Sequence, residues 1–311
     1  MLGLCRNGFG GVALLGMLGG LGFGKSYESV TPRNKFFTKA PHYTPKANSV
    51  IFLYMDGGVS QVDSFDPKPR LDRENGQDPY QKFKVDATQF NNIGKILKSP
   101  WSFKQYGESG MWVSELFPHI ASCVDDIALI RSMVSEFPEH TNANYFLHTG
   151  HGLQGRPSMG AWTTYGLGTE NQNLPGYIVL DGGLIPPGGL DNFNSGFLPA
   201  SHQASIFQAR ENPIANIRPL EQDRHLQQTK MALAEKMDQS LLGKLGDAGK
   251  IESAIKNYEL AYLMQSSVPE LVDLTGETAA TRKLYGLDSD DQHTRSYGTQ
   301  CLMARRMVEQ G

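Results

Sequence analysis

Ser49-Val-Ile-Phe-Leu-Tyr-Met-Asp-Gly-Gly-Val-Ser-Gln-Val-Asp-Ser-Phe-Asp-Pro-Lys-Pro69 is the stretch that decides the fold class. Within it, Val50 to Met55 is an unbroken apolar run, rich in β-branched and aromatic side chains. Such a run predicts a strand buried on both faces, as in the middle of a parallel sheet. The run ends at Asp56-Gly57-Gly58, where the glycines allow a sharp turn and leave room for a ligand near the backbone.

Asp56 is the first candidate site residue, because it directly follows the predicted strand. In open α/β sheets, ligands bind at the carboxyl ends of the strands. We therefore predict that Asp56 is a ligand of a divalent metal, and that Gly57 and Gly58 contact the substrate. The alternative is that Asp56 only caps the turn.

Length and composition fit a globular protein of one large α/β domain or two ordinary domains, with 311 residues, 39% hydrophobic and 20% charged. A formal net charge of -3 gives no reason to expect nucleic acid as a partner. The three cysteines lie far apart and form no CxxC pair, which argues against both a disulfide framework and a zinc knot.

The amino-terminal residues differ in composition from the rest of the chain. Residues 1–24 are rich in Gly and Leu and contain no acidic residue. The apolar run from Val12 to Phe23 is too short and Gly-rich for a stable membrane span and is typical of an export signal. We expect residues 1–24 to be the remnant of such a signal and 25–47 a linker, so that the protein is exported. The alternative for residues 1–24 is a flexible tail.

Two segments after the opening stretch predict a βαβ unit. Residues 113–123 place apolar side chains on one helical face, and residues 127–133 form a second apolar run. A helix followed by a strand, after the first strand, predicts two neighbouring parallel strands with the helix packed on them.

A helix with a candidate nucleophile follows, from about Thr141 to Leu147, with Gly150 as its C-terminal stop. Thr141 or Asn142 is the expected N-cap. A hydroxyl or imidazole there lies among unpaired N–H groups that favour anions, a position that suits attack on a phosphate or sulfate ester. The candidate catalytic residues are therefore Thr141 and His140, with Asn142 as a substrate contact. The alternative is that Thr141 only caps the helix and the nearby histidines lie on the surface.

The second half of the chain is predicted to be mainly helical. The helix at 158–167 is expected to lie in the core with its Trp162 and Tyr165. A short strand at 176–180 precedes a Gly- and Pro-dense loop, which could line a pocket or be an ordinary wide loop. Helices at 223–245 and 251–264 predict a helical insertion within about 220–266, and helices at 281–285 and 299–308 end the chain.

An ordered set of motifs resembles a known family: 55–69, Leu129-Ile-Arg-Ser-Met133, 140–150, Pro157-Ser-Met-Gly-Ala-Trp162, Leu284-Tyr-Gly286 and 301–309. These motifs are similar to a secreted bacterial family of unknown function, number 1501, grouped with the alkaline phosphatase and sulfatase superfamily. Members usually begin with a twin-arginine signal, and the segment from Gly8 to Leu18 looks like the tail of one.

The resemblance implies an α/β fold: an alkaline phosphatase-like, mostly parallel sheet sandwiched by helices, here incomplete and spanning 48–311. It implies one or two divalent metals (Zn, Ca or Mg), with Asp56 at a ligand position. The superfamily nucleophile opens a helix that ends in Thr-Gly, and counting back from Thr149-Gly150 reaches His140 with Thr141 beside it. The implied substrate is a small-molecule or polysaccharide ester.

The chain departs from the superfamily pattern in two ways. Phosphatases use Ser or Thr where His140 stands, and the Cys/Ser-x-Pro-x-Arg motif of sulfatases is not found. The remaining metal ligands of the superfamily come from later strands, so we expect a C-terminally truncated chain. We therefore expect a metal-dependent hydrolase of phosphate or sulfate esters, with a non-catalytic exported binding or structural protein as the alternative.

Overall fold

The computed structural model describes residues 38–39, 41–86, 92–183, 186–208, 213–214, 217–219, 223–242 and 248–311. The chain forms two compact units. The first unit contains the described residues up to Thr44, together with Gly160–Gly182 and Phe197–Gly311. The second unit contains Pro45–Met159 and Gly183–Gly196. Predictions for residues 1–24, including the export signal, lie outside the described residues.

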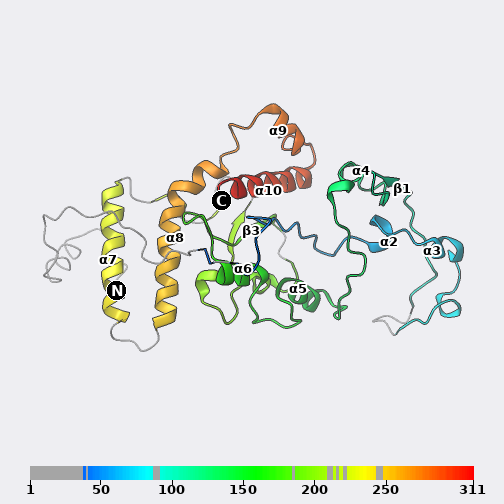
Figure 1. Ribbon diagram of the computed structural model, residues 1–311, viewed down its shortest axis with the longest axis horizontal. Helices are drawn as coiled ribbons and strands as arrows, with labels where there is room; N and C mark the ends of the chain where they lie inside the picture. The colour runs from blue at the N-terminus through cyan, green and yellow to red at the C-terminus, as the bar shows by residue number, and fades with distance from the viewer. Residues whose placement is uncertain are drawn as a thin grey trace. The chain divides into compact units, whose positions relative to one another are not determined.

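The first unit combines helices with a two-stranded parallel sheet, β3 (Ile178–Asp181) paired with β4 (Ser205–Gln208) (Figure 1). Its helices are α6 (Met159–Leu167), η5 (Ala200–His202), α7 (Arg224–Leu242), α8 (Ala248–Val272), α9 (Ala279–Leu284) and α10 (Gln292–Glu309). Each helix predicted from the sequence in this half is confirmed, but α8 extends eight residues beyond its predicted end at 264 and α10 begins seven residues before its predicted start at 299. The predicted strand at 176–180 is confirmed as β3.

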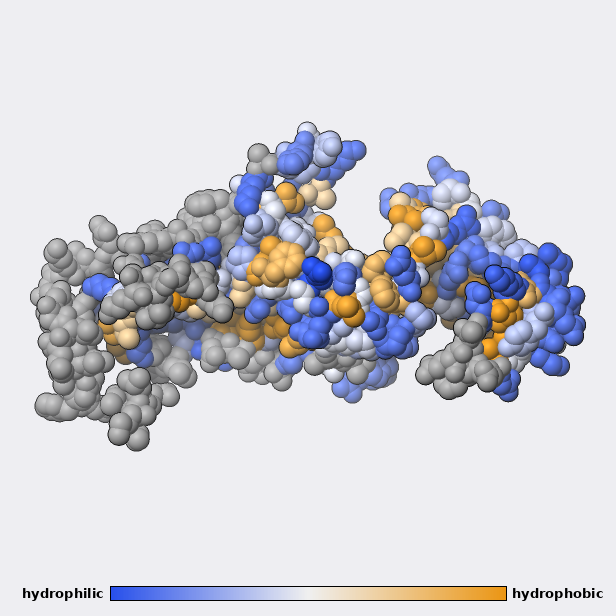
Figure 2. All heavy atoms as spheres, turned by 90° about the horizontal axis from the view of Figure 1, so that it is seen from below, coloured by the Kyte–Doolittle hydropathy of each residue, from blue (hydrophilic) through white to orange (hydrophobic). Residues whose placement is uncertain are grey.

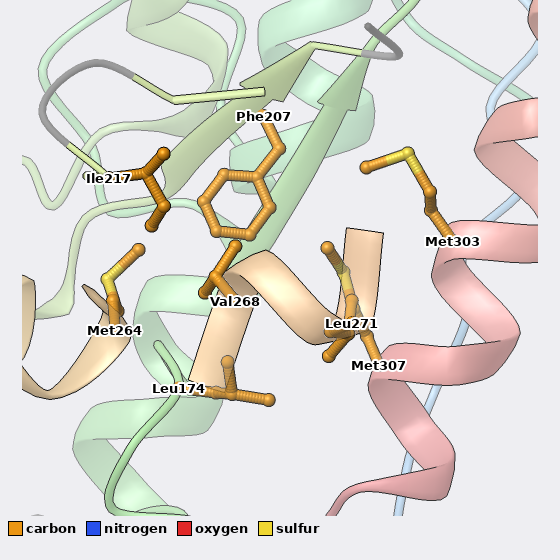
Figure 3. Packing of buried hydrophobic residues seen from close by; sticks show 8 residues of the cluster. All are labelled: Leu174, Phe207, Ile217, Met264, Val268, Leu271, Met303 and Met307. Atoms are coloured by element: carbon orange, nitrogen blue, oxygen red, sulfur yellow. The ribbon is translucent and has the colours of Figure 1, made fainter. Parts of the chain in front are cut away.

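Phe207 on β4 lies at the centre of the main hydrophobic core and has no exposed surface. Figure 3 shows its ring directed towards Val268 on α8, with Met303 on α10 nearby. The other buried members of this cluster are Leu174, Ile217, Met264, Leu271 and Met307. Met264, Val268 and Leu271 are spaced by four and three residues, so they share one face of α8. The helical periodicity of the sequence therefore selects the buried face.

The second unit has shorter elements: α2 (Gln61–Ser64), α3 (Pro69–Glu74), η2 (Pro79–Gln81), β1 (Phe103–Tyr106), β2 (Met111–Ser114), α4 (Pro118–Ala121), η3 (Val124–Asp126), α5 (His140–Thr149) and η4 (Gly189–Phe193). The strands β1 and β2 form an antiparallel hairpin. A small cluster of Val113, Ala121 and Val124 packs against partly buried residues that include Phe65 and Phe117. The predicted helix α5 is confirmed.

The predicted βαβ unit is wrong. Val50–Met55 has no regular secondary structure and belongs to neither sheet, and Val50 is 82% exposed. Residues 127–133 likewise form no strand, and Ile130 is 66% exposed. In place of one helix at 113–123 the structure has the end of β2 and then α4, which begins at Pro118 because proline fits the first turn of a helix but interrupts its interior.

The fold class is therefore mixed helices and small sheets, which is compatible with α/β. Both sheets in the described residues have two strands, and a large parallel sheet of the alkaline phosphatase type is not among them. The expectation that Trp162 and Tyr165 lie in the core is also wrong, because these side chains are 45% and 41% exposed. Within the described ranges, none of the helices combines the length and hydrophobicity that crossing a membrane requires.

Candidate functional site

The turn at Asp56 forms as the sequence predicts. The backbone N–H of Gly58 donates to the carbonyl oxygen of Met55 at 3.1 Å, and Gly57 and Gly58 have φ angles of 79° and 71°. These left-handed conformations favour glycine. A Cβ atom at either position would meet no described atom within 4 Å, so backbone conformation, not crowding, requires the glycines. Asp56 itself is exposed at the start of this turn.

Tyr54 connects Asp56 to helix α5. Its hydroxyl group lies 2.9 Å from Oδ1 of Asp56 and 2.5 Å from Oδ1 of Asn144. The amide of Asn144 is oriented by a second bond, from its Nδ2 to the carbonyl oxygen of Pro187 at 3.0 Å. Two acceptor oxygens from different segments thus converge on a phenol that has a single proton to donate.

The environment keeps Tyr54 neutral. Burial raises its pKa well above the ordinary value, and the hydrogen bond and negative charge of Asp56 raise it further. A phenolate beside a carboxylate would be doubly unfavourable, because the two like charges repel each other in a partly desolvated place. Tyr54 therefore acts as a hydrogen-bond donor that holds the Asp56 carboxylate next to α5.

His148 forms the buried side of the site, one turn after Asn144 on α5. It is 5% exposed and packs edge-on against Tyr54, Phe193 and Phe52, with ring centroids 4.8, 5.0 and 6.0 Å away. Burial lowers its pKa, so the imidazole is neutral. Its buried Nε2 has no hydrogen-bond partner among the described residues. The imidazole therefore supports the Tyr54 ring by packing, and the surface position given as an alternative is wrong for His148.

The N-cap of α5 is Glu139, not Thr141 or Asn142. One carboxylate oxygen of Glu139 accepts the backbone N–H of Asn142 at 3.0 Å. Hydrogen bonds from the backbone of Thr141 and Asn142 hold the pKa of Glu139 below its usual range, and the side chain of Thr141 lowers that pKa further. A carboxylate of the chain thus occupies the anion-binding N–H groups that the sequence reading assigned to an ester.

The other predicted residues lie close by along α5. His140 is its exposed first residue, and Thr141 is half-buried. Thr141 precedes Asn144 by three residues, about 4.5 Å along the helix axis at 1.5 Å per residue. Asn142 is committed to local structure, because its Nδ2 donates to the carbonyl oxygen of Gly152 at 2.7 Å. Asp56 is therefore attached to α5 one turn from the His140–Thr141 pair.

The Gly- and Pro-dense loop, for which the sequence left open a pocket lining or an ordinary wide loop, packs against the same helix. Asn144 donates to Pro187, and the hydroxyl of Tyr145 donates to the carbonyl oxygen of Gly188 at 3.1 Å. Asn192 has no exposed surface and donates to the carbonyl oxygens of Pro187 and Gly189. The loop before η4 thus holds the buried face of α5 in place.

Sequence reasoning missed Tyr54, Asn144 and Glu139. A signal existed for Tyr54, because residues two apart in an extended segment point to the same side, and Tyr54 is two residues before Asp56. Glu139 gave a weaker signal, since Ser, Thr, Asp and Asn are the preferred N-cap residues. Asn144 became a candidate only through its contact with Tyr54.

The donors at this site suit a hard metal ion. Within the described ranges there is no group of three or more His, Cys, Asp or Glu side chains that could hold a metal. A zinc site with three protein ligands therefore does not fit these residues. Asp56 instead offers one exposed carboxylate, which suits Mg²⁺, an ion that keeps most of its waters.

Comparison with known proteins places the chain in a family. The search of curated proteins and the search of solved structures each gave no match. A family model described as "Protein of unknown function (DUF1501)" matches residues 47–311, a range that includes the turn at Asp56 and all of α5. The chain belongs to this family.

Proposed function

We propose that the protein is an exported, metal-dependent hydrolase of phosphate or sulfate esters. The observation that carries the proposal is the contact of Tyr54 with both Asp56 and Asn144. This contact attaches a carboxylate, suited to a hard metal, to the helix whose first turn holds the candidate nucleophiles. A superfamily relationship to alkaline phosphatases and sulfatases, inferred from the resemblance of the sequence motifs, supports the same chemistry.

Thr141 is the better nucleophile of the two candidates. Its side chain contributes to the lowered pKa of Glu139, so the Glu139 carboxylate is placed to accept the Thr141 proton as the oxygen attacks. In this scheme the Thr141 oxygen bonds to phosphorus or sulfur as Glu139 accepts its proton, and the bond to the leaving alcohol breaks. Water later hydrolyses the resulting Thr141 ester and releases phosphate or sulfate. His140 is exposed and could instead protonate the leaving alcohol.

Asp56 would hold the metal, which when bound polarises the ester and neutralises its negative charge. Tyr54 keeps the Asp56 carboxylate in place and remains protonated. The backbone N–H groups at the start of α5 would stabilise charge on the ester only when the Glu139 carboxylate releases them while staying beside the Thr141 hydroxyl. Substrate binding is thus proposed to compete with the N-cap.

The test is turnover of p-nitrophenyl phosphate and p-nitrophenyl sulfate with added Mg²⁺, Ca²⁺ or Zn²⁺. Thr141→Ala should abolish turnover, whereas Thr141→Ser, which keeps a hydroxyl, should retain a measurable part of it. His140→Ala should lower the rate without abolishing it. Equal turnover by Thr141→Ala and the wild-type protein would exclude Thr141 as the nucleophile.

One observation favours the alternative of a non-catalytic exported binding protein. Glu139 fills the anion position at the start of α5, and a weakly basic carboxylate there stabilises the helix without any ligand. Replacing Glu139 by Gln distinguishes the two functions. A hydrolase should change its KM for the anionic ester, whereas a non-catalytic protein should show no turnover in either form.

A further inference from the structure

The segment Val50–Met55 of the second unit leaves an unbroken apolar run at the surface. The rings of Phe52 and Tyr54 are stacked, with centroids 6.5 Å apart. Both rings also contact His148 on α5, so these alternate side chains share one side of the segment. The residues that alternate with them are 45%, 57% and 44% exposed: Ile51, Leu53 and Met55. One side of the segment thus lies against α5, and the other side is open and apolar.

The backbone of the same segment is largely unpaired. Inside it, the N–H of Tyr54 donates to the carbonyl oxygen of Phe52 at 3.1 Å, and the carbonyl oxygen of Met55 accepts the N–H of Gly58 in the turn. No other backbone group of Val50–Met55 has a backbone partner within the described part of the chain. A row of free N–H and C=O groups beside apolar side chains is what an added strand pairs with.

Single exposed apolar side chains are common on this protein, and Figure 2 shows them interspersed with hydrophilic ones on the visible face. Leu97 is an example: it is 77% exposed, but the backbone of its neighbour Ile96 is paired with Gly76 and Gln77. Val50–Met55 differs because its backbone is free as well. It also contains no charged residue and no proline, the residue types that keep exposed strands from pairing.

We propose that Val50–Met55 pairs with the same segment of a second copy of this chain, as two antiparallel strands, and so forms a homodimer. A polypeptide strand satisfies the free backbone groups, whereas a lipid surface would leave them without hydrogen bonds. A twofold axis perpendicular to the strand pair relates two identical segments in antiparallel directions. Such an interface is self-complementary, because each copy contributes the same residues.

The charges on either side of the segment favour a second copy and the antiparallel direction. Residues 41–49 contain the exposed Lys46 and no acidic residue. Residues 56–66 contain no basic residue and three acidic ones: Asp56, Asp63 and Asp66. Antiparallel pairing brings the basic end of each segment to the acidic end of the other, whereas parallel pairing would bring like charges together. This complementarity occurs twice in the dimer.

The experiment is sedimentation equilibrium of the full chain over about a hundredfold range of concentration. Hydrogen exchange, followed by mass spectrometry, is measured at both ends of that range. One variant combines Ile51→Lys with Leu53→Lys, and a second is Lys46→Asp. The matched control is Leu97→Lys, the same substitution at an exposed leucine whose neighbouring backbone is already paired. Circular dichroism of every variant verifies folding. The readout is association and not turnover, so its failure leaves the proposed hydrolysis standing.

We expect a monomer–dimer equilibrium in which the amides of residues 50–55 exchange more slowly at high concentration. The double-lysine variant should weaken the dimer about tenfold or more, because like charges would meet across the strand pair. Lys46→Asp should weaken it about threefold or more, because an attraction becomes a repulsion. Leu97→Lys should associate like the wild type.

Four results would overturn the proposal. The wild type could be monomeric throughout the range, or a dimer could form without slower exchange at residues 50–55. Leu97→Lys could dissociate the dimer as strongly as the double-lysine variant does, or Lys46→Asp could strengthen association.

Discussion

Replacing Tyr54 by Phe tests the connection between Asp56 and α5 with the loss of a single oxygen atom. The hydroxyl oxygen of Tyr54 lies 2.9 Å from Oδ1 of Asp56 and 2.5 Å from Oδ1 of Asn144. Asp56 is exposed, so water can replace the lost donor there at little cost. Asn144 is 8% exposed, and its amide is fixed by Pro187, so its oxygen is left without this donor.

An unsatisfied buried acceptor costs about 1–3 kcal/mol. We therefore expect Tyr54→Phe to lower the free energy of unfolding by about 1–3 kcal/mol, mainly through Asn144. The measurement is urea unfolding followed by circular dichroism. Tyr43→Phe is the matched control, because Tyr43 is 88% exposed and should change stability by less than about 0.5 kcal/mol.

A double-mutant cycle locates the energy. The coupling between Tyr54→Phe and Asn144→Ala should exceed the coupling between Tyr54→Phe and Asp56→Asn. The reasoning is refuted if Tyr54→Phe is as stable as the wild type, or if its coupling to Asn144 is negligible.

Three further predictions concern the core, a helix contact and pH. Phe207→Ala should lower the free energy of unfolding by about 3–5 kcal/mol in urea melts, because it leaves a cavity at the centre of the main core. A decrease of less than about 1 kcal/mol in the free energy of unfolding would contradict this packing. Gly298→Ala should destabilise the protein strongly, because the new Cβ would lie 1.8 Å from the carbonyl oxygen of Tyr285. Gly166→Ala on α6 meets no described atom and should stabilise the protein by about 0.5–1 kcal/mol. Similar melting temperatures for the two variants would count against the contact of α10 with Tyr285. The pKa of His148 is lowered in the folded protein. The stability that neutral His148 contributes is therefore present above its ordinary pKa of 6.5 and is lost as the pH falls towards the lowered value. An NMR titration that gives His148 a pKa at or above 6.5 would overturn this prediction.

Local signals in the sequence predicted the helices well. The C-terminal stop of α5 follows from Gly150, which adopts a φ of 74° there, a conformation that glycine accepts at low cost. The last two turns of α8 were missed, because the predicted helix ends at 264 and the buried Val268 and Leu271 lie beyond it. Such signals depend on residues three or four apart, which are in contact whenever the helix forms.

The predicted parallel strands failed for a physical reason. The apolar run at Val50–Met55 indicates a segment that would gain from burial, but strand formation also needs a neighbouring strand to pair with its backbone. Periodicity within one segment carries no information about that neighbour. The helix predicted at 113–123 failed for a different reason: Pro118 lies inside the range and should have divided it.

The candidate site was predictable in part. Asp56 and the first turn of α5 follow from the turn glycines and the helix pattern. The contacts that join them depend on Tyr54 meeting Asn144, 90 positions later in the chain, and a pairing of that range leaves no periodic trace in the sequence. The N-cap was misassigned because a Glu in an extended conformation reaches the free N–H groups as well as the shorter residues do.

The most direct test of the central claim is the binding of Mg²⁺ to the full chain, measured by calorimetry. The account predicts that Asp56→Asn weakens Mg²⁺ binding about tenfold or more, because it removes the charged ligand. Asp63→Asn is the control, since Asp63 is a nearby carboxylate that accepts a hydrogen bond from Ser60 and has no assigned role in the site. Equal Mg²⁺ affinity in Asp56→Asn and the wild type, or an equal loss in Asp63→Asn, would contradict the claim that Asp56 holds the metal.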